Sequence, residues 1–254
     1  MKFEEKIKER FLYSKKNNLL KSFYFFLQRF RLKGLKKNYT VTGVDLLLDN
    51  FFKNINIKKG IYIDVGCNHP FFNNYTYLLH KNDWTGINID LDFHYVDLFN
   101  YFRPRDFNKQ AAIADKQGET DLFFYHNKSA INTLSKEMHS SRGSAAKEIK
   151  KIQTQTLNSV IENSPFADNK INLLTIDVEG FEMNVLKGFD LERYSPEAVV
   201  VEYIDPSMKK EEFYNQDIKN VINSELYNFM KDRNYTFVNW LHTDLIFVNN
   251  RIKD

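Results

Sequence analysis

Hydrophobic side chains change their spacing near residue 60, and the change predicts two kinds of structure. In residues 3–30 and again in 44–52, apolar side chains recur every three or four positions. This period is typical of amphipathic helices. From residue 61 onward, short β-branched apolar runs replace it. Such runs predict buried parallel strands.

The apolar runs alternate with helical patterns over most of the remaining chain. The predicted strands are residues 61–65, 86–90, 109–113, 171–176, 198–202, 236–238 and 245–248. Helical patterns such as 181–187 and 221–231 lie between several of them. This alternation predicts an α/β fold with a doubly wound, mostly parallel sheet. The polar residues 136–150 interrupt it, and we expect a mobile loop or a surface helix there.

The composition indicates a cellular compartment and shows that charge is distributed unevenly along the chain. The 254 residues are 43% hydrophobic and 27% charged, which argues against wholesale disorder. A single cysteine excludes an internal disulfide framework, and neither a membrane-spanning run nor a secretory signal is evident, so we expect a cytoplasmic protein. Residues 1–37 have a net charge of +9. Because the whole chain has a net charge of +3, the remaining residues sum to −6. This acidic remainder gives no reason to expect nucleic-acid binding.

The charge and the hydrophobic period together predict two parts. Residues 1–57 form a basic, helical N-terminal extension, and residues 58–254 form the α/β domain. The basic and aromatic extension could contact an anionic membrane surface as a peripheral helix. We favour the alternative in which a helical pair covers the sheet or a dimer interface; in the second case the protein would be a homo-oligomer.

Acidic residues stand where two successive strands end. Ligands of open α/β sheets bind at the carboxyl ends of the strands, where Asp64 and Asp90 lie, and Gly66 lets a ligand approach the backbone. The turn after the first strand lacks Gly-x-Gly-x-x-Gly, which speaks against a pyrophosphate cofactor and a dehydrogenase. Acidic strand ends suit S-adenosylmethionine, a nucleoside with a positive sulfonium. The alternative is that both aspartates only end strands or cap helices.

Several stretches, in this order, resemble the FkbM-type S-adenosylmethionine-dependent methyltransferases. They are 62–70 (YIDVGCNHP), 74–77 (NYTY), 84–90 (WTGINID), 103–108 (RPRDFN), 130–134 (AINTL), 174–182 (LTIDVEGFE), 185–188 (VLKG) and 201–202 (VE). The similarity extends over about residues 58 to 249. His69-Pro70 departs from the Asp-Gly of many members, which leaves the shape of the first loop open.

The resemblance implies a seven-stranded, Rossmann-like methyltransferase sheet whose last strand pair includes an antiparallel member. It also implies residue roles. Asp64, Gly66 and Asn68 would line the methionine end of S-adenosylmethionine, with Cys67 beside it, and Asp90 would hold the ribose. Asp106 and the segment Ala111-Ala112 would form the adenine wall.

Methyl transfer to a hydroxyl requires alignment of the acceptor and a group that removes its proton. Asp177 and Glu179 follow a predicted strand and point to the same side of an extended segment. Clustered carboxylates raise each other's pKa and could supply the base; they could also hold a divalent cation through oxygen ligands. His69, on the first loop, is the preferred histidine as a further catalytic base.

The sequence therefore predicts an enzyme, an O-methyltransferase. The resemblance implies a carbohydrate or another small hydroxyl compound as the acceptor. The alternative is a nucleoside-binding or scaffolding module that has the same fold but no turnover. The carboxylates Asp64, Asp90, Asp177 and Glu179 are all present, which disfavours that alternative.

Overall fold

The computed structural model describes residues 37–126, 129, 131–143, 145–204 and 216–252. Residues 1–36 of the predicted N-terminal extension lie outside the described residues, so the helices predicted there and the contacts of this segment with membrane or partner stay predictions. The chain divides into compact units at Met1–Lys37 and Asn38–Asp254.

The second unit begins well before the expected boundary at 57/58 because helix α3 (Val44–Asn54) belongs to it. Val44, Leu48 and Phe52 of this helix are buried against the sheet and against Trp84. The change of hydrophobic period at residue 60 thus marks the first strand and not the start of the folded unit.

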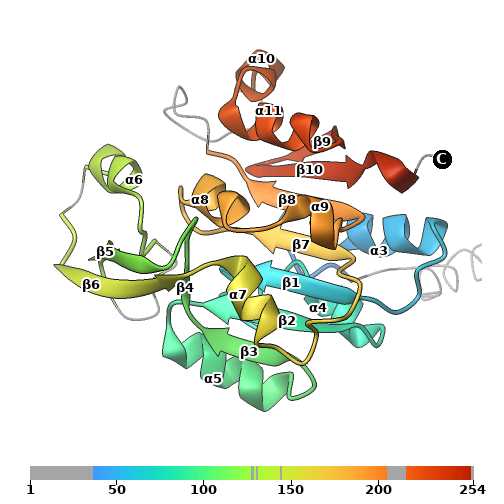
Figure 1. The fold of residues 1–254 in the computed structure, drawn as a ribbon, viewed down its shortest axis with the longest axis horizontal. Coiled ribbons are helices and arrows are strands. Elements are labelled where there is room, and N and C mark those ends of the chain that lie inside the picture. The colour runs from blue at the N-terminus through green and yellow to red at the C-terminus, as the bar shows by residue number, and fades with distance from the viewer. Residues whose placement is uncertain (1–36, 127–128, 130, 144, 205–215, 253–254) are drawn as a thin grey trace, which may run out of the picture. The chain divides into compact units, whose positions relative to one another are not determined.

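A seven-stranded sheet forms the centre of this unit (Figure 1). Its strands, in spatial order, are β3 (Phe107–Gln110), β2 (Thr85–Asp90), β1 (Ile61–Val65), β7 (Leu173–Ile176), β8 (Ala198–Glu202), β10 (Asp244–Asn249) and β9 (Tyr235–Leu241). Neighbours from β3 to β8 are parallel, whereas β10 is antiparallel to both β8 and β9. The predicted α/β fold, with a mostly parallel sheet and an antiparallel member in the last pair, is confirmed.

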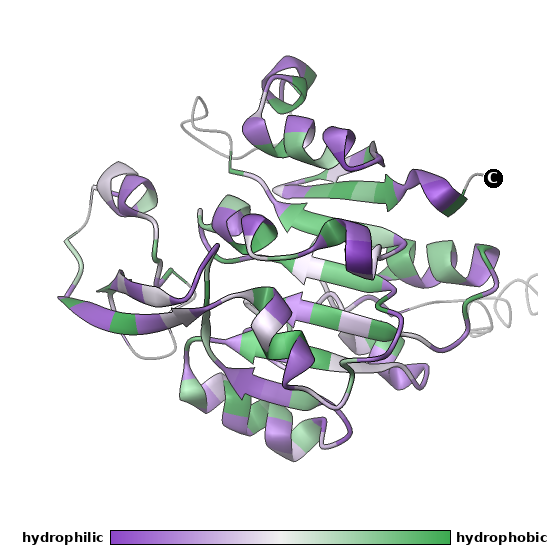
Figure 2. Cartoon of the chain, viewed as in Figure 1, coloured by the Kyte–Doolittle hydropathy of each residue, from purple (hydrophilic) through white to green (hydrophobic). Residues whose placement is uncertain are grey.

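Helices cover both faces of the sheet. One face packs on α3 and α4 (Tyr77–Lys81). The other face packs on α7 (Leu157–Glu162), α8 (Glu182–Lys187), α9 (Leu191–Tyr194), α10 (Ile218–Ile222) and α11 (Glu225–Asp232). Helix α5 (Phe93–Phe102) lies beside β2 and β3. Strands β8 and β10 are hydrophobic along most of their length, and the edge strand β3 is largely polar (Figure 2). Burial on both faces explains why the central strands read as continuous apolar runs.

A second sheet of three strands is inserted between β3 and α7, and we call the described residues from 111 to 156 the insertion. Its order is β4 (Ala112–Ile113), β6 (Glu148–Gln155) and β5 (Gly118–Phe124), with α6 (Lys136–Ser141) between β5 and β6 along the chain. The expected single strand 109–113 is divided between the two sheets. Helix α6 lies within residues 136–150, where a surface helix was one of the two expectations. Strands β5 and β6 were not predicted; the sequence of β6, EIKKIQTQ, has few apolar residues.

The remaining differences concern helix ends. The helical pattern 221–231 is divided between α10 and α11, where Ser224 begins a new helix by accepting the Tyr227 N–H at 3.1 Å. The 3₁₀ turn η2 (Asn250–Ile252) follows β10.

Within the described residues, every helix is too short or too polar to cross a lipid bilayer.

Candidate active site

A cavity of about 320 Å³ opens at the carboxyl ends of the parallel strands. The backbone pairing aligns Asp90, Asp177, Glu202 and Asp244 along this edge, on or directly after β2, β7, β8 and at the start of β10. Gly66, which follows β1, lies between Asp90 and Asp177 in this order. All five residues line the cavity. The sheet therefore brings together carboxylates that are far apart in the sequence.

The cavity has an apolar end and an acidic end. Its apolar lining comes mainly from β2, the β3–β4 connection and the second sheet, with Phe181 added from the β7–α8 turn: Ile89, Leu91, Ala111, Ile113, Leu134 and Phe181. Among the described residues that line it, carboxylates are numerous and no Lys or Arg occurs. Volume and lining are typical of a small-molecule site, and the charge favours a ligand with positive groups.

Asp90 is held in one orientation at the end of β2. Its Oδ2 accepts the N–H of Asn68 and its Oδ1 accepts the N–H of Asp92, both at 2.8 Å. Burial raises the pKa of Asp90 to about 6. Each carboxylate oxygen keeps a further lone pair, so the group can accept two hydrogen bonds from a ribose diol.

The backbone of the first loop is turned toward the sheet. The N–H groups of Gly66 and Cys67 both donate to the Ile89 carbonyl, at 2.9 and 3.1 Å, and that of Asn68 donates to Asp90. These amides are therefore not available as an anion-binding nest for phosphate. The observation agrees with the missing glycine-rich turn and with a cofactor that carries no phosphate.

Gly66 allows this close approach, and we expect Gly66→Ala to destabilise the protein by about 2–4 kcal/mol. Its φ is 82°, and a Cβ at this position would overlap the backbone oxygen of Asp177. Urea denaturation should show the loss. Gly118→Ala is the matched control because nothing lies within 4 Å of its Cβ position. Equal midpoints for the two variants would contradict the argument.

A strained turn carries Asp177 and Glu179 into the cavity. Glu179 and Gly180 have φ values of 59° and 89°, so the segment turns instead of remaining extended. The Glu182 carboxylate, at the start of α8, accepts the N–H groups of Val178 at 3.1 Å and Gly180 at 2.9 Å. Glu182 thus holds the turn, and Asp177 and Glu179 both line the cavity as expected, although through a turn.

Glu179 is bound to the insertion. Arg142, which follows α6, forms an ion pair with its carboxylate, and Thr133 Oγ1 donates to its backbone oxygen at 2.7 Å. Arg142 also donates to the Ile131 carbonyl at 2.5 Å. The insertion therefore fixes one wall of the acidic end.

The carboxylates raise each other's pKa values. Burial, followed by the charges of Glu179 and Glu182, raises the pKa of Asp177 well above its usual value. Burial and the Asp177 charge do the same for the pKa of Glu202, and burial raises the pKa of Asp244 to about 6. A positive ligand beside these groups would lower their pKa values again, which suits a base that is needed only in the loaded site.

Three of these acids also satisfy the geometry of a cation site. Ligand atoms of Asp177, Glu179 and Glu202 lie within 4.8 Å of one another. Oxygen donors of this type suit Mg²⁺ or Ca²⁺. The divalent cation that the sequence left open thus has a candidate location.

The structure does not bring Asp64 to the cavity. Asp64 pairs with Asn88 and Thr175 in the sheet, two residues below the level of Asp90 and Asp177. It is 2% exposed, and its carboxylate accepts hydrogen bonds from Thr175 at 2.8 Å, Thr76 at 3.0 Å and Asn74 at 3.1 Å. Through these contacts Asp64 holds the first loop, and it is not among the residues that line the cavity.

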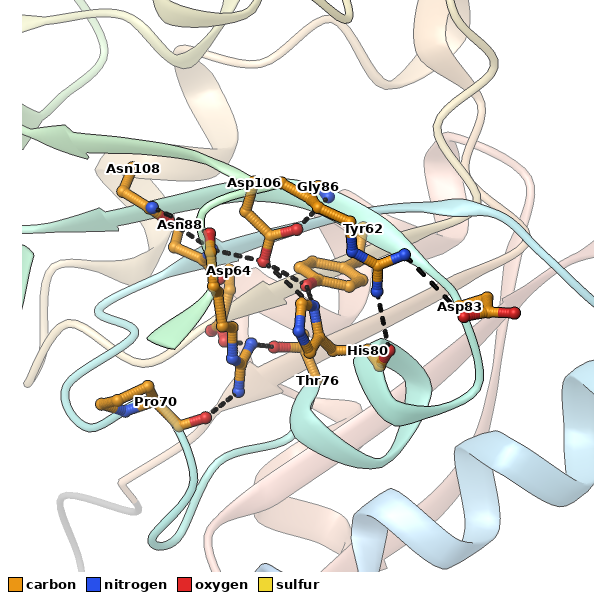
Figure 3. Close-up of polar contacts among 12 residues, drawn as sticks. Tyr62, Asp64, Pro70, Thr76, His80, Asp83, Gly86, Asn88, Asp106 and Asn108 are labelled. Carbon is orange, nitrogen blue, oxygen red and sulfur yellow. Dashed lines mark hydrogen bonds and ion pairs between the residues drawn. The ribbon is translucent and has the colours of Figure 1, made fainter. Parts of the chain in front are cut away.

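Asp106 also belongs to a buried network. Its carboxylate points toward Tyr62 and Asn88 (Figure 3), and it accepts hydrogen bonds from them at 2.5 and 3.0 Å. It is not among the residues that line the cavity, so its position does not support an adenine wall. Of the segment Ala111-Ala112, Ala111 lines the cavity, whereas Ala112 packs in the second sheet.

Cys67 and His69 lie outside the cavity lining as well. Cys67 is 3% exposed, and burial raises the pKa of its thiol. His69 Nδ1 accepts the N–H groups of Phe71 and Phe72 at 3.4 and 3.3 Å, and burial lowers its pKa. His69 thus organises the first loop, and its position does not support a catalytic role.

Sequence reasoning gave no role to several lining residues. They are Val41, Thr42, Asn73, Tyr75, Glu202, His242, Thr243 and Asp244. Glu202 could have been identified from the sequence as a site residue, since it ends a predicted strand. Asp244 could not, because it begins an antiparallel strand, and the rule that ligands bind at strand ends applies to parallel strands.

Comparisons with known proteins identify the family. The chain is similar in structure to monomeric WbdD, with a TM-score of 0.39 and 12% identity over 85% of this chain and 42% of that one, so it spans less than half of WbdD. It is also similar to a putative caffeoyl-CoA O-methyltransferase from Staphylococcus aureus, with a TM-score of 0.38 and 11% identity over 97% of each chain. No curated protein has a significantly similar sequence. The family model of the methyltransferase FkbM domain matches residues 64–237, more than half of the chain. This chain therefore belongs to the FkbM methyltransferase domain family.

Proposed function

We propose that this methyltransferase uses S-adenosylmethionine to methylate a hydroxyl of a carbohydrate or similar small acceptor. The observation that carries the proposal is the row Asp90, Asp177, Glu202 and Asp244 along one cavity whose described lining contains no Lys or Arg. This charge favours a cofactor with a positive sulfonium, and the apolar end suits its adenine.

The residues present fit this cofactor. Asp90 would accept hydrogen bonds from both ribose hydroxyls, and Gly66 and Asn68 line the adjoining part of the cavity. Ala111 and Leu134 belong to the apolar end that would enclose the adenine. When bound, S-adenosylmethionine supplies a methyl carbon that its positive sulfur has already activated.

Asp177 is the proposed base. A sugar hydroxyl is a weak nucleophile, and a carboxylate within hydrogen-bond reach can accept its proton as the oxygen attacks. Asp177 lies between the ribose-binding Asp90 and the remaining acids, where an acceptor would meet the methyl group. Glu179, with its Arg142 partner, orients the turn beside it.

The test has two readouts. Thermal stabilisation by S-adenosylhomocysteine reports the cofactor site, and transfer of tritiated methyl groups to a panel of sugars, with and without EDTA, reports turnover. We expect both. Stabilisation without transfer to any acceptor would favour the inactive nucleoside-binding or scaffolding module, and the absence of stabilisation would contradict the proposal.

We expect Asp90→Asn to weaken S-adenosylhomocysteine binding about 10- to 100-fold, the effect of losing hydrogen bonds to a charged group. The wild-type affinity should fall as the pH drops below about 6, because the raised pKa of Asp90 makes it protonated there. Above this pH the carboxylate is ionised and the affinity should be constant. Calorimetry measures both effects, with Asp168→Asn, at an exposed position, as the control. Unchanged affinity in Asp90→Asn would remove it from the site.

A further inference from the structure

The acidic row continues past Asp177, away from the proposed ribose site. Glu202 on β8 and Asp244 on β10 pair directly with each other across the sheet and both line the cavity. With Asp90 assigned to the ribose and Asp177 to the reacting hydroxyl, this further part of the cavity is the acceptor end.

Polar atoms at the acceptor end lack partners. Glu202 Oε2 and Thr42 Oγ1 are buried and have no hydrogen-bond partner in the structure, and both residues line the cavity. Tyr75 donates to Asp244 Oδ1 at 2.7 Å, which fixes this carboxylate and leaves its second oxygen for a ligand. Buried polar atoms are almost always satisfied, so these atoms indicate a ligand that brings hydrogen-bond donors.

The charge at this end selects among such ligands. Burial raises the pKa values of Glu202 and Asp244, and the charge of the neighbouring His242 lowers that of Asp244 only in part. Arg142 is paired with Glu179, and no Lys or Arg of the described residues lines the cavity. A phosphate or carboxylate on the acceptor would be repelled, whereas a protonated amine would form charge-assisted hydrogen bonds.

The arrangement fits an extended ligand better than a metal ion. Glu179 already has a cation in Arg142. The carboxylates of Asp177, Glu202 and Asp244 project from successive positions of adjacent strands, which are about 4.8 Å apart. Asp177 and Glu202 approach each other and, with Glu179, could also hold an ion, whereas Asp244 extends the acidic lining beyond this group toward β10.

Thr42, His242, Thr243 and Asp244 lie outside residues 64–237, the part that matches the family model, whereas Glu202 lies within it. From these observations we propose that the methylated hydroxyl belongs to an amine-bearing acceptor, an amino sugar or amino alcohol, and that Glu202 and Asp244 bind its ammonium group. The inference rests on the proposed function, since it concerns the acceptor of that same site.

Four matched probes test it by calorimetry on the full chain saturated with S-adenosylhomocysteine at neutral pH: glucosamine, glucose, N-acetylglucosamine and glucose 6-phosphate. Binding of S-adenosylhomocysteine is measured first, so its failure counts against the proposed function and not against this inference. We expect glucosamine to bind at least about 10-fold more tightly than glucose or N-acetylglucosamine. Glucose 6-phosphate should bind most weakly.

Variants assign the preference to residues. Asp244→Asn and Glu202→Gln should each reduce the preference for glucosamine over glucose, measured at saturating S-adenosylhomocysteine, to less than about 3-fold. Asparagine at 244 can still accept the Tyr75 hydroxyl, so folding should be preserved. Glu192→Gln, at an exposed position on α9, should keep the full preference.

Several results would overturn the inference. They are equal binding of glucosamine and glucose, tighter binding of glucose 6-phosphate, no detectable binding of glucosamine, or a preference that survives in both variants. Binding that requires Mg²⁺ and disappears with EDTA would assign the acidic row to a metal ion instead.

Discussion

Replacing Asp177 with asparagine should reduce methyl transfer by about 100-fold or more, the usual contribution of a positioned general base. The substitution keeps the size and most hydrogen bonding of the side chain but cannot accept the hydroxyl proton. Because Asp177 does not hold the ribose, S-adenosylhomocysteine should still bind. The measurements are single-turnover transfer of tritiated methyl groups and calorimetry on the same preparation.

The matched control is Asp168→Asn, which removes a carboxylate at an exposed position. It should leave both activity and binding unchanged. Full activity in Asp177→Asn would exclude Asp177 as the base, and Glu202, whose pKa Asp177 raises, would be the next residue to test.

Arg103→Met should produce the largest loss of stability, about 3–5 kcal/mol, as expected when one partner of a buried charged network is removed. Arg103 is fully buried, and its guanidinium donates to Thr76 Oγ1 at 2.8 Å, to Asn74 Oδ1 at 2.6 Å and to the Pro70 carbonyl. Its charge also lowers the pKa of Asp64, which burial raises. Without Arg103, buried acceptors lose their donors and Asp64 loses its compensating charge. Urea denaturation measures the effect.

Arg105→Met is a control from the same turn. Arg105 is half-exposed and its ion pair with Asp83 is long, at 3.8 Å, so the loss should be below about 1 kcal/mol. Adding Asp64→Asn to Arg103→Met should cost less than the sum of the single changes, because it removes the uncompensated charge. Strict additivity would show that the two groups are not coupled.

The alternation of apolar runs and helical patterns was sufficient to predict the fold, because strands buried on both faces have to be apolar along their whole length. The insertion could not be predicted in the same way. Strand β6 reads EIKKIQTQ, and most of its side chains are partly or fully exposed. Its strand structure depends on pairing with β5, which lies far enough away in the chain to leave no local pattern.

Strand ends identified part of the site. The rule that ligands bind at the carboxyl ends of parallel strands led to Asp90, Asp177 and Glu179, which line the cavity. The same rule included Asp64, which lies two residues too early and takes part in a buried network. A displacement of two residues keeps the side chain on the same face but moves it one level down the sheet.

The sequence alone determined the fold class, the family and the acidic character of the site, since these follow from hydrophobic period, motif order and charge. Tertiary structure decided which carboxylates meet. Asp244 reaches the cavity only because β10 runs antiparallel to β8 and so presents its first residue at the edge where the parallel strands end. Thr42 reaches it from before the first strand, and Arg142 reaches Glu179 from the insertion. These contacts depend on strand direction and chain crossing, which local sequence patterns do not encode.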